Sequence, residues 1–413
     1  MSSTKSLTPL DVAQDFVLKR VKPLKPIACP LSECCGLVLA ADIESREDVP
    51  PFRNTASDGF AVRAKDTVGA SKENPILLKV VATIAAGGAE DPELESGSAV
   101  RIMTGAPVPT DADSVVMVED TIAPVDDDEN AIYVIKEAAV GDSIRDAGSD
   151  IQIGQTVLPA GTVLNPAAIG VLASLGYKKV PVFARPKVGV ISTGSELVDA
   201  GDIGKGMIRD SNRPALIEAV KQSGFDAVDL GIVVDDAQLL ENAFKEAAIL
   251  CDAIITSGGV SVGDYDLTKQ VLAKLSNGDM KWMQVAIKPA KPFAFGTVSG
   301  TPLFGLPGNP VSALVSFELF ARPAIRKLMN HPTPFKRLLN ATLQEDVVRR
   351  RDGKVHFLRA LCQSVNGELQ ASLKVGQMSH MLSRMASANA LIVVPDGDGY
   401  EAGTKLPVIL LDE

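Results

Sequence analysis

The sequence has few histidines and cysteines for its length, and their scarcity excludes several kinds of site. Three histidines and five cysteines occur among 413 residues, and no two cysteines form a C-x-x-C pair. The chain therefore has too few of these residues to favour a zinc site of histidine and cysteine, a Ser-His-Asp triad or a disulfide framework. Any metal site should use oxygen ligands, which favours Mg²⁺ or a similar hard cation. The absence of a disulfide framework predicts a reducing, cytoplasmic setting.

The sequence also has fewer positively charged than negatively charged residues, and it lacks long apolar runs. The formal net charge is −10, which argues against a general nucleic-acid surface. No run approaches the roughly 18 apolar residues of a membrane span, and residues 1–19 lack a signal-peptide core. The nucleotide-binding patterns G-x-x-x-x-G-K-[ST] and strand-linked G-x-G-x-x-G are missing as well. We therefore expect no nucleic-acid or membrane partner, and any anionic ligand would need cations held locally.

The pattern of apolar runs and turn residues changes several times along the chain, which predicts several domains. Residues 185–331 alternate apolar strand-like runs with helical patterns, as in a doubly wound, mostly parallel α/β domain. Short β-prone runs between Gly, Pro and Asp turns indicate a β-rich insert domain before it and a C-terminal β-domain after it. We predict four domains, namely residues 1–48 with 144–184, residues 49–143, residues 185–331 and residues 332–413.

The most informative stretch is residues 254–266, in which a buried-type strand is followed by a pair of glycines. Glycines let backbone N–H groups converge on an anion, and a helix start adds a favourable dipole. Asp264 and Asp266 would repel a phosphate unless a divalent cation or a proton lay between. The pattern indicates a phosphate cradle beside an acidic metal site, although a plain strand-to-helix turn with Asp266 as N-cap stays open. The candidate residues of this loop are Ser257, Gly258, Gly259, Ser261 and Asp266.

Other loops of the α/β segment also lie where parallel sheets bind ligands, outside the carboxyl ends of strands. Two of them contribute Thr193, Gly194, Glu196 and Asp235, while a rigid turn at Pro307, Gly308, Asn309 and Pro310 opens a long helix. Lys288 and Lys291 are each followed by proline, which stiffens the segment that presents their ammonium groups. Such cations suit an oxyanion, but lysines on a solvated edge strand and an ordinary helix start at residue 310 remain alternatives.

Taken in order, these stretches resemble the molybdopterin molybdenumtransferase family, which includes the C-terminal domains of gephyrin and of the plant molybdenum-cofactor enzyme. The likeness spans nearly the whole chain. Single motifs are weak, and Asp58 and Thr104 taken alone indicate turns. The ordered set is specific, and its markers are residues 57–61, 103–107, 144–145 with 148–151, 192–197, 257–263, 288–292 and 307–312.

The resemblance implies a reaction in which adenylylated molybdopterin and molybdate give molybdenum cofactor and AMP, assisted by Mg²⁺. It also implies an elongated four-domain protomer with a barrel-like C-terminal domain, and a homodimer. On this likeness Glu196, Asp235 and Asp266 hold the metal and act catalytically with Asp58. The substrate-binding residues it implies are Thr104, Asp150, Thr193, Gly194, Ser257, Gly258, Gly259, Ser261, Lys288, Lys291, Pro307, Gly308, Asn309 and Pro310.

Four positions depart from the family pattern. Ser195 stands where an acidic residue or asparagine is usual, and Gln284 stands where lysine is frequent. Arg53 replaces an aspartate or alanine, and Ala290 replaces a glycine. The main carboxylates and both lysines are retained, which favours an enzyme.

Two other functions compete with molybdenum insertion. Adenylylation of molybdopterin by ATP is an alternative because the α/β segment resembles those adenylyltransferases, and such an enzyme is also a candidate partner. A gephyrin-like scaffold is the other alternative. The flanking β-domains favour insertion over adenylylation.

Overall fold

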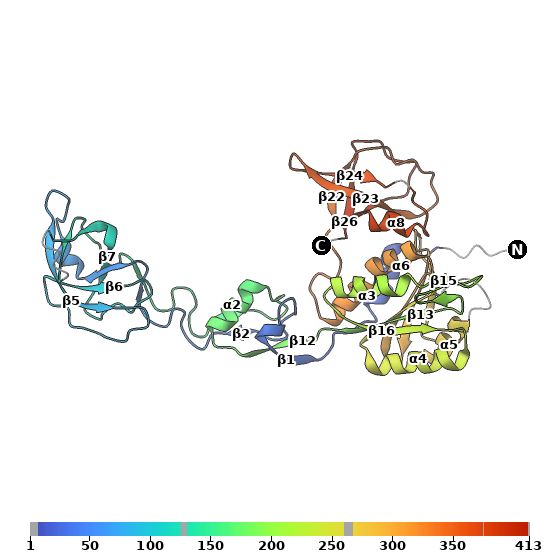
Figure 1. Ribbon diagram of the computed structural model, residues 1–413, viewed down its shortest axis with the longest axis horizontal. Coiled ribbons are helices and arrows are strands. Elements are labelled where there is room, and N and C mark those ends of the chain that lie inside the picture. The colour runs from blue at the N-terminus through green and yellow to red at the C-terminus, as the bar shows by residue number, and fades with distance from the viewer. Residues whose placement is uncertain (1–6, 125–129, 260–266, 375, 412–413) are drawn as a thin grey trace. The chain divides into compact units, whose positions relative to one another are not determined.

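The computed structural model describes residues 7–124, 130–259, 267–374 and 376–411. The chain divides into two compact units (Figure 1). Unit 1 contains residues 1–29, 36–40 and 181–413, and unit 2 contains residues 30–35 and 41–180. No helix of the described residues is long and apolar enough to cross a membrane.

Unit 1 is built on a six-stranded sheet of order β16-β13-β17-β21-β20-β18. The first four strands are parallel, whereas β20 and β18 run antiparallel to their neighbours. Strand β17 is buried at every position, as expected when helices cover both faces of a parallel sheet. The prediction of a doubly wound, mostly parallel sheet is confirmed. The strands are β13 (Lys187–Thr193), β16 (Asp226–Val233), β17 (Ala253–Ser257), β18 (Lys281–Gln284), β20 (Pro292–Val298) and β21 (Thr301–Leu306).

Helices cover this sheet on both faces (Figure 1). α4 (Ala237–Leu250) and α5 (Leu267–Leu275) pack together and bury Leu240, Phe244 and Leu272 against the strands. α3 (Asn212–Gln222) contacts β13, β16 and α6 (Pro310–Ser316). A short pair, β14 (Leu197–Val198) and β15 (Ile208–Arg209), lies between β13 and α3 in the chain.

The helix that begins at Pro310 contains a π-helical turn. α6 continues into η4 (Phe317–Ala321), in which the Arg322 N–H donates to the Phe317 carbonyl, and then into α7 (Arg322–Leu328). Pro323 lacks an N–H and cannot make the α-helical hydrogen bond to the Leu319 carbonyl, which accounts for an irregular turn here. α1 (Leu10–Leu18) packs on this segment, and Gln14 Nε2 donates to the Leu319 carbonyl at 3.0 Å. The predicted grouping of residues 1–48 with 144–184 remains a prediction, but α1 itself makes these contacts within unit 1.

The C-terminal part of unit 1 is a small β-barrel. Strands β23-β24-β22-β26-β25 follow one another, and pairing between β23 and β25 closes the ring around buried alanine, leucine and valine side chains. β19 (Ile287–Lys288) adds to β23 in parallel and places Lys288 beside His356 in the register. The remaining elements are β22 (Leu339–Leu343), β23 (Val355–Val365), β24 (Glu368–Leu373), α8 (Leu382–Ala386), β25 (Ala390–Val394) and β26 (Lys405–Leu410).

Unit 2 is dominated by a six-stranded sheet of order β7-β4-β6-β5-β9-β8 with an apolar cluster on each face. α2 (Pro166–Ser174) begins at Asn165, whose side chain caps it by accepting from the Ala168 N–H at 2.8 Å. The sheet strands are β4 (Gly59–Val62), β5 (Ile76–Ile84), β6 (Ser98–Ile102), β7 (Ser114–Met117), β8 (Thr121–Ile122) and β9 (Ala131–Val134). Two short pairs are β2 (Ile43–Glu44) with β11 (Thr156–Leu158), and β3 (Asn54–Thr55) with β10 (Ile144–Arg145).

Candidate functional site

A small polar pocket lies at the carboxyl ends of the parallel strands of unit 1. Its volume is about 120 Å³, and we name it the acidic pocket. It brings together the ends of β13 and β17, the start of α3 and the turn before α6, as expected for ligand sites of doubly wound sheets. The predicted residues that line it are Thr193, Glu196, Ser257, Gly258, Gly308 and Pro310.

Two glycines, Gly258 in the pocket lining and Gly194 in the loop that carries Glu196, are required by the local geometry. Gly194 has φ +149°, and a Cβ on it would lie 2.6 Å from a carboxylate oxygen of Glu196. Gly258 has φ +95°, and a Cβ there would lie 2.6 Å from the Thr193 carbonyl oxygen. Any other residue would be strained at both positions. The glycines therefore let the Glu196 carboxylate and the ends of β13 and β17 approach one another closely.

Several buried polar atoms around the acidic pocket have no hydrogen-bond partner among the described residues. They are Ser192 Oγ, Thr193 Oγ1, Thr256 Oγ1 and Asn212 Oδ1. Buried polar atoms of this kind cost free energy unless a ligand, water or ion satisfies them. Three of the four residues, Ser192, Thr193 and Asn212, line the pocket. A polar ligand bound there would supply the missing partners.

Asn212 links two of the predicted loops and was not among the predicted site residues. Its Nδ2 donates to Ser257 Oγ and to the Gly308 carbonyl, both at 2.7 Å. The side chain thus ties the glycine-pair loop to the turn before α6. The sequence signal was available, because residues 209–213 are polar and join a strand to a helix.

The start of α3 is fixed by a buried arginine. The Arg213 guanidinium forms ion pairs with Asp199, Asp210 and Asp229. Burial alone would lower the pKa of Arg213, but the hydrogen bonds to Asp229 and Asp210 outweigh it and the pKa is raised. Arg213 therefore stays charged and holds the first turn of α3, where Asn212 lies.

Asp235 is joined to the loop of Glu196 by a reciprocal pair of hydrogen bonds. The Ser195 N–H donates to Asp235 Oδ2 at 3.0 Å, and the Asp235 N–H donates to Ser195 Oγ at 2.9 Å. Asp236 is used differently, because its Oδ1 caps α4 by accepting from the Gln238 and Leu239 N–H groups. Of the two adjacent aspartates, Asp235 is therefore the one bonded to the predicted site loop.

Lys288 and Lys291 line a second, larger pocket of about 890 Å³, which we name the lysine pocket. Neither ammonium group forms an ion pair with any residue that the structure describes. Burial lowers the pKa of His356 in the same pocket, and Arg349 and Lys288 lower it further against the hydrogen bond to Asp352. Positive charge is thus concentrated here within a chain of net charge −10. The pocket suits a small anion.

The turn before α6 borders both pockets. Gly308 and Pro310 line the acidic pocket, whereas Asn309 and Ser312 line the lysine pocket. Asn309 occupies the N-cap position of α6 but makes no capping hydrogen bond, so its side chain is not used by the helix. Glu196 and the two lysines therefore line two pockets that share one turn, and not a single cavity, while Asp235 lines neither pocket.

Arg359 is a second residue that sequence reasoning missed. It is fully buried on β23, its Nη2 donates to the Gly376 and Met378 carbonyls, and its Nε and Nη1 have no partner among the described residues. Met378 and Ser379 line the lysine pocket, and the Val311 N–H of α6 donates to the Ser379 carbonyl. Arg359 thus organises one wall of that pocket. An arginine within an apolar strand was the available signal.

Three predicted residues lie in unit 2. Asp58 Oδ1 accepts from the backbone N–H and the hydroxyl of Thr104, both at 2.7 Å. These two hydrogen bonds, with Arg101 nearby, lower the pKa of the Asp58 carboxyl. Asp150 is exposed, and its N–H donates to the Val49 carbonyl. Asp58 and Thr104 therefore form one ionised, hydrogen-bonded pair.

The donor set of the acidic pocket consists of oxygen atoms. Glu196 lines it together with the unpartnered hydroxyls of Ser192 and Thr193, which fits a hard cation such as Mg²⁺. Ser261 and Asp266 lie outside the described residues, and no cluster of three or more His, Cys, Asp or Glu side chains is found among those described. Gly259, the last described residue of its loop, has φ +64° and packs against Thr268.

Comparison with known proteins identifies the family of this chain. Three family descriptions match in order: the MoeA N-terminal region (domain I and II) at residues 8–176, a probable molybdopterin binding domain at residues 189–327, and the MoeA C-terminal region (domain IV) at residues 340–411. Molybdopterin molybdenumtransferase 2 of Mycobacterium tuberculosis is 41% identical over 403 residues, which cover 96% of this chain and 97% of that protein. Molybdopterin molybdenumtransferase of Bacillus subtilis is 38% identical over 377 residues, which cover 91% of this chain and 87% of that protein. The crystal structure of the molybdopterin biosynthesis moeA protein from Pyrococcus horikoshii OT3 superposes with a TM-score of 0.83 at 30% identity, over 98% of this chain and 100% of that one. The chain belongs to the molybdopterin molybdenumtransferase family.

Proposed function

We propose that this protein inserts molybdenum during molybdenum cofactor biosynthesis, converting adenylylated molybdopterin and molybdate into molybdenum cofactor and AMP. The observation that carries the proposal is the shared turn at residues 308–312, which borders an oxygen-lined acidic pocket on one side and a two-lysine pocket on the other. The reaction needs a place for a phosphoanhydride and a place for an oxyanion. The curated relatives of this chain carry the name of this transferase.

In this proposal the acidic pocket receives the phosphoanhydride. Backbone N–H groups of the glycine loops and the hydroxyls of Thr193 and Ser257 bind phosphate oxygens, and Glu196 and Asp235 hold Mg²⁺ together with Asp266. The metal, when bound, neutralises phosphate charge. Attack by a water oxygen on one phosphorus of the anhydride forms a new P–O bond as the bridging P–O bond to that phosphorus breaks, so that anhydride and water together give AMP and the phosphate of molybdopterin.

The lysine pocket receives molybdate in this proposal. Lys288 and Lys291 are unpaired cations within the described residues, so they can neutralise a dianion without first breaking an ion pair. Asn309 and Ser312 add neutral polar groups from the shared turn. The resemblance assigns Asp58, Thr104 and Asp150 to the same reaction, in a homodimer located in the cytoplasm. A molybdopterin adenylyltransferase is the partner that would supply the adenylylated substrate.

The decisive experiment measures AMP release by the purified full chain from adenylylated molybdopterin, with and without molybdate. We expect AMP only when molybdate is present, and a Glu196→Gln variant that retains its thermal unfolding temperature but releases none. Glu218→Gln, which removes an exposed carboxylate paired with Lys221, is the matched control and should behave as wild type. Consumption of ATP in the absence of molybdate would instead identify an adenylyltransferase, and the proposal would be wrong.

A further inference from the structure

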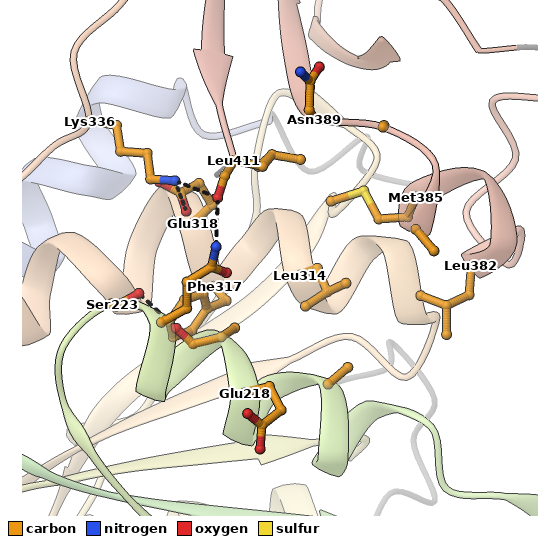
Figure 2. A pocket seen from close by; sticks show the side chains of 15 residues that line it. Glu218, Ser223, Leu314, Phe317, Glu318, Lys336, Leu382, Met385, Asn389 and Leu411 are labelled. Carbon is orange, nitrogen blue, oxygen red and sulfur yellow. Dashed lines mark hydrogen bonds and ion pairs between the residues drawn. The ribbon is translucent and has the colours of Figure 1, made fainter. Parts of the chain in front are cut away.

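The cavities of unit 1 differ in the balance of their charges. One cavity of about 510 Å³ lies among α3, α6, η4 and α8, and acidic, basic and neutral side chains line it together (Figure 2). Its carboxylates Glu218 and Glu318 are paired with Lys221 and Lys336. The lysine pocket is different, because five cationic side chains and one carboxylate line it among the described residues. The cations are Lys288, Lys291, Arg349, Arg350 and Lys354, and the carboxylate is Asp352.

The Asp352 carboxylate is shared by three neighbours. Its Oδ1 accepts from Arg349 Nη2 and its Oδ2 accepts from Lys354 Nζ, both at 2.9 Å. His356 Nε2 lies 3.2 Å from both oxygens. Burial acts against ionisation, but the hydrogen bonds from Lys354 and His356 lower the pKa of Asp352 to about 2. Asp352 is therefore an ionised acceptor, and His356 Nε2 carries the proton that it donates.

The other ring nitrogen of His356, Nδ1, is the atom that would bind an additional proton. It has no hydrogen-bond partner among the described residues. The side chain is 10% exposed, and Nδ1 is not one of the fully enclosed unpartnered atoms. His356 also lines the lysine pocket. The ring can therefore change its charge within the folded protein.

The protein groups around His356 oppose a positive charge on the ring. Burial, Arg349 and Lys288 lower the pKa of His356, and Asp352 acts in the opposite direction. Lys288 is the neighbour of His356 in the register of β19 and β23, whereas β25 presents the apolar Val394 on the other side. Without an anion in the pocket, the ring is therefore mainly neutral at pH 7.

An anion held by Lys288 and Lys291 would reverse this balance. An opposite charge within about 4–6 Å favours the charged form of a titratable group. A dianion acts about twice as strongly as a monoanion of the same shape, because the Coulomb energy is proportional to the charge. The coupling is reciprocal, so an anion that favours protonation of the ring itself binds more tightly to the protonated form.

We propose that His356 is a further anion-binding residue of the lysine pocket, which takes up a proton as a tetrahedral dianion enters and thereby favours dianions over monoanions. The inference rests on the proposed function in taking molybdate as that dianion. Lys288 and Lys291 attract any anion, whereas a charge that forms in response to the ligand selects for ligand charge.

Two oxyanions of the same shape test this inference on the full chain. Molybdate and perrhenate are both tetrahedral and carry charges of −2 and −1. Isothermal titration in buffers of different ionisation enthalpy gives the affinity and the number of protons taken up. We expect molybdate to take up about half a proton at about pH 6.5 and to bind roughly threefold more tightly there than at about pH 8. Perrhenate should show a smaller uptake and a smaller change. Molybdate binding without proton uptake at about pH 6.5 would overturn the proposal.

A variant assigns the proton to His356. His356→Gln keeps a side-chain donor for Asp352 but cannot become charged. It should lose the proton uptake, and its affinity ratio of molybdate to perrhenate at about pH 6.5 should fall toward the wild-type ratio at about pH 8. His331→Gln, which changes a histidine outside the pocket lining, is the matched control and should retain both properties.

The outcomes separate this inference from the proposed function. Unchanged proton uptake in a His356→Gln variant with wild-type thermal unfolding would overturn the role of His356 and leave the molybdate site in place. No molybdate binding by the wild-type chain would contradict the molybdate site itself, and this inference would fall with it.

Discussion

Gln14 Nε2 on α1 donates a 3.0 Å hydrogen bond to the Leu319 carbonyl in the π-helical turn. Three hundred and five positions separate the two residues in the chain. Pro323 denies this carbonyl its α-helical donor, so the side chain of a distant helix provides one. The contact joins the N-terminal helix to the helix that begins at the shared turn of the two proposed substrate pockets.

Removing this donor should destabilise the protein. We expect Gln14→Ala to lower the free energy of unfolding by about 1 kcal/mol, because a part-buried carbonyl loses its partner. Asp15→Ala, which removes an exposed ion pair with Lys19 on the same helix, should change it by less than about 0.5 kcal/mol. Denaturant titration of both variants gives the comparison. A Gln14→Ala variant as stable as wild type would show that the hydrogen bond contributes nothing.

Ser195 should support turnover through Asp235. Its Oγ accepts from the Asp235 N–H, and its own N–H donates to the Asp235 carboxylate. Ser195→Ala keeps the second contact and loses the first, which costs about 1 kcal/mol or roughly a fivefold change in rate. Ser195→Asn should retain part of the activity, because an amide oxygen can accept from the same N–H. Molybdate-dependent AMP release by the three proteins measures this, and full activity of Ser195→Ala would assign Ser195 no role.

The α/β architecture could be predicted because its signals are local. Buried strands such as Ala253–Ser257 are unbroken apolar or small-residue runs, and the alternation with helices implies a parallel sheet. The loops at the carboxyl ends of the strands follow from that topology. Thr193, Glu196, Ser257 and Gly308 could therefore be predicted as neighbours from sequence, and they line one pocket.

Other features depend on contacts that no local pattern encodes. The Asn212 side chain reaches Ser257 and Gly308, which lie 45 and 96 positions away. Arg359 occupies a strand position where an apolar residue would be expected, and only the fold shows that it holds carbonyls of the loop beside Ser379. The division of carboxylate and lysine groups between two pockets likewise required coordinates. Ala290 is an intermediate case, since replacement of a usual glycine signalled a special backbone.

Ala290 lies in the left-handed region, with φ +74°, between the two lysines of the lysine pocket. Glycine would relieve roughly 1–2 kcal/mol of left-handed strain but lose a buried methyl worth about 0.8 kcal/mol and add about 0.5–1 kcal/mol of unfolded-state entropy. We therefore expect Ala290→Gly to stay within about 0.5 kcal/mol of wild type in the free energy of unfolding. Ala290→Val adds a β-branch at this φ and should cost about 2 kcal/mol or more. Equal stability of the glycine and valine variants in urea titration would contradict this explanation.

Lys291 should contribute to molybdate affinity more than to stability. Its ammonium group is exposed in the lysine pocket and forms no ion pair with a described residue. Lys291→Ala should raise the molybdate concentration for half-maximal AMP release by about tenfold, since loss of one charged contact to a dianion is worth about 1.4 kcal/mol. Lys281→Ala, on the neighbouring strand β18 and outside the pocket, is the matched control. An unchanged molybdate dependence would remove Lys291 from oxyanion binding.

His331 should make stability depend on pH below neutrality. Burial, with Arg326 and Arg322 nearby, lowers the pKa of His331 from 6.5 to about 4. Between these values the unfolded chain binds more protons than the folded one, so stability rises with pH across this window. The contribution is complete above about pH 6.5 and is lost as the pH falls toward about 4. His331→Gln should flatten this part of a plot of unfolding free energy against pH, whereas His380→Gln at an exposed position should not. Because burial also lowers the pKa of His356, a smaller slope of the same sign should remain in His331→Gln. A slope identical to wild type would mean that His331 titrates alike in both states.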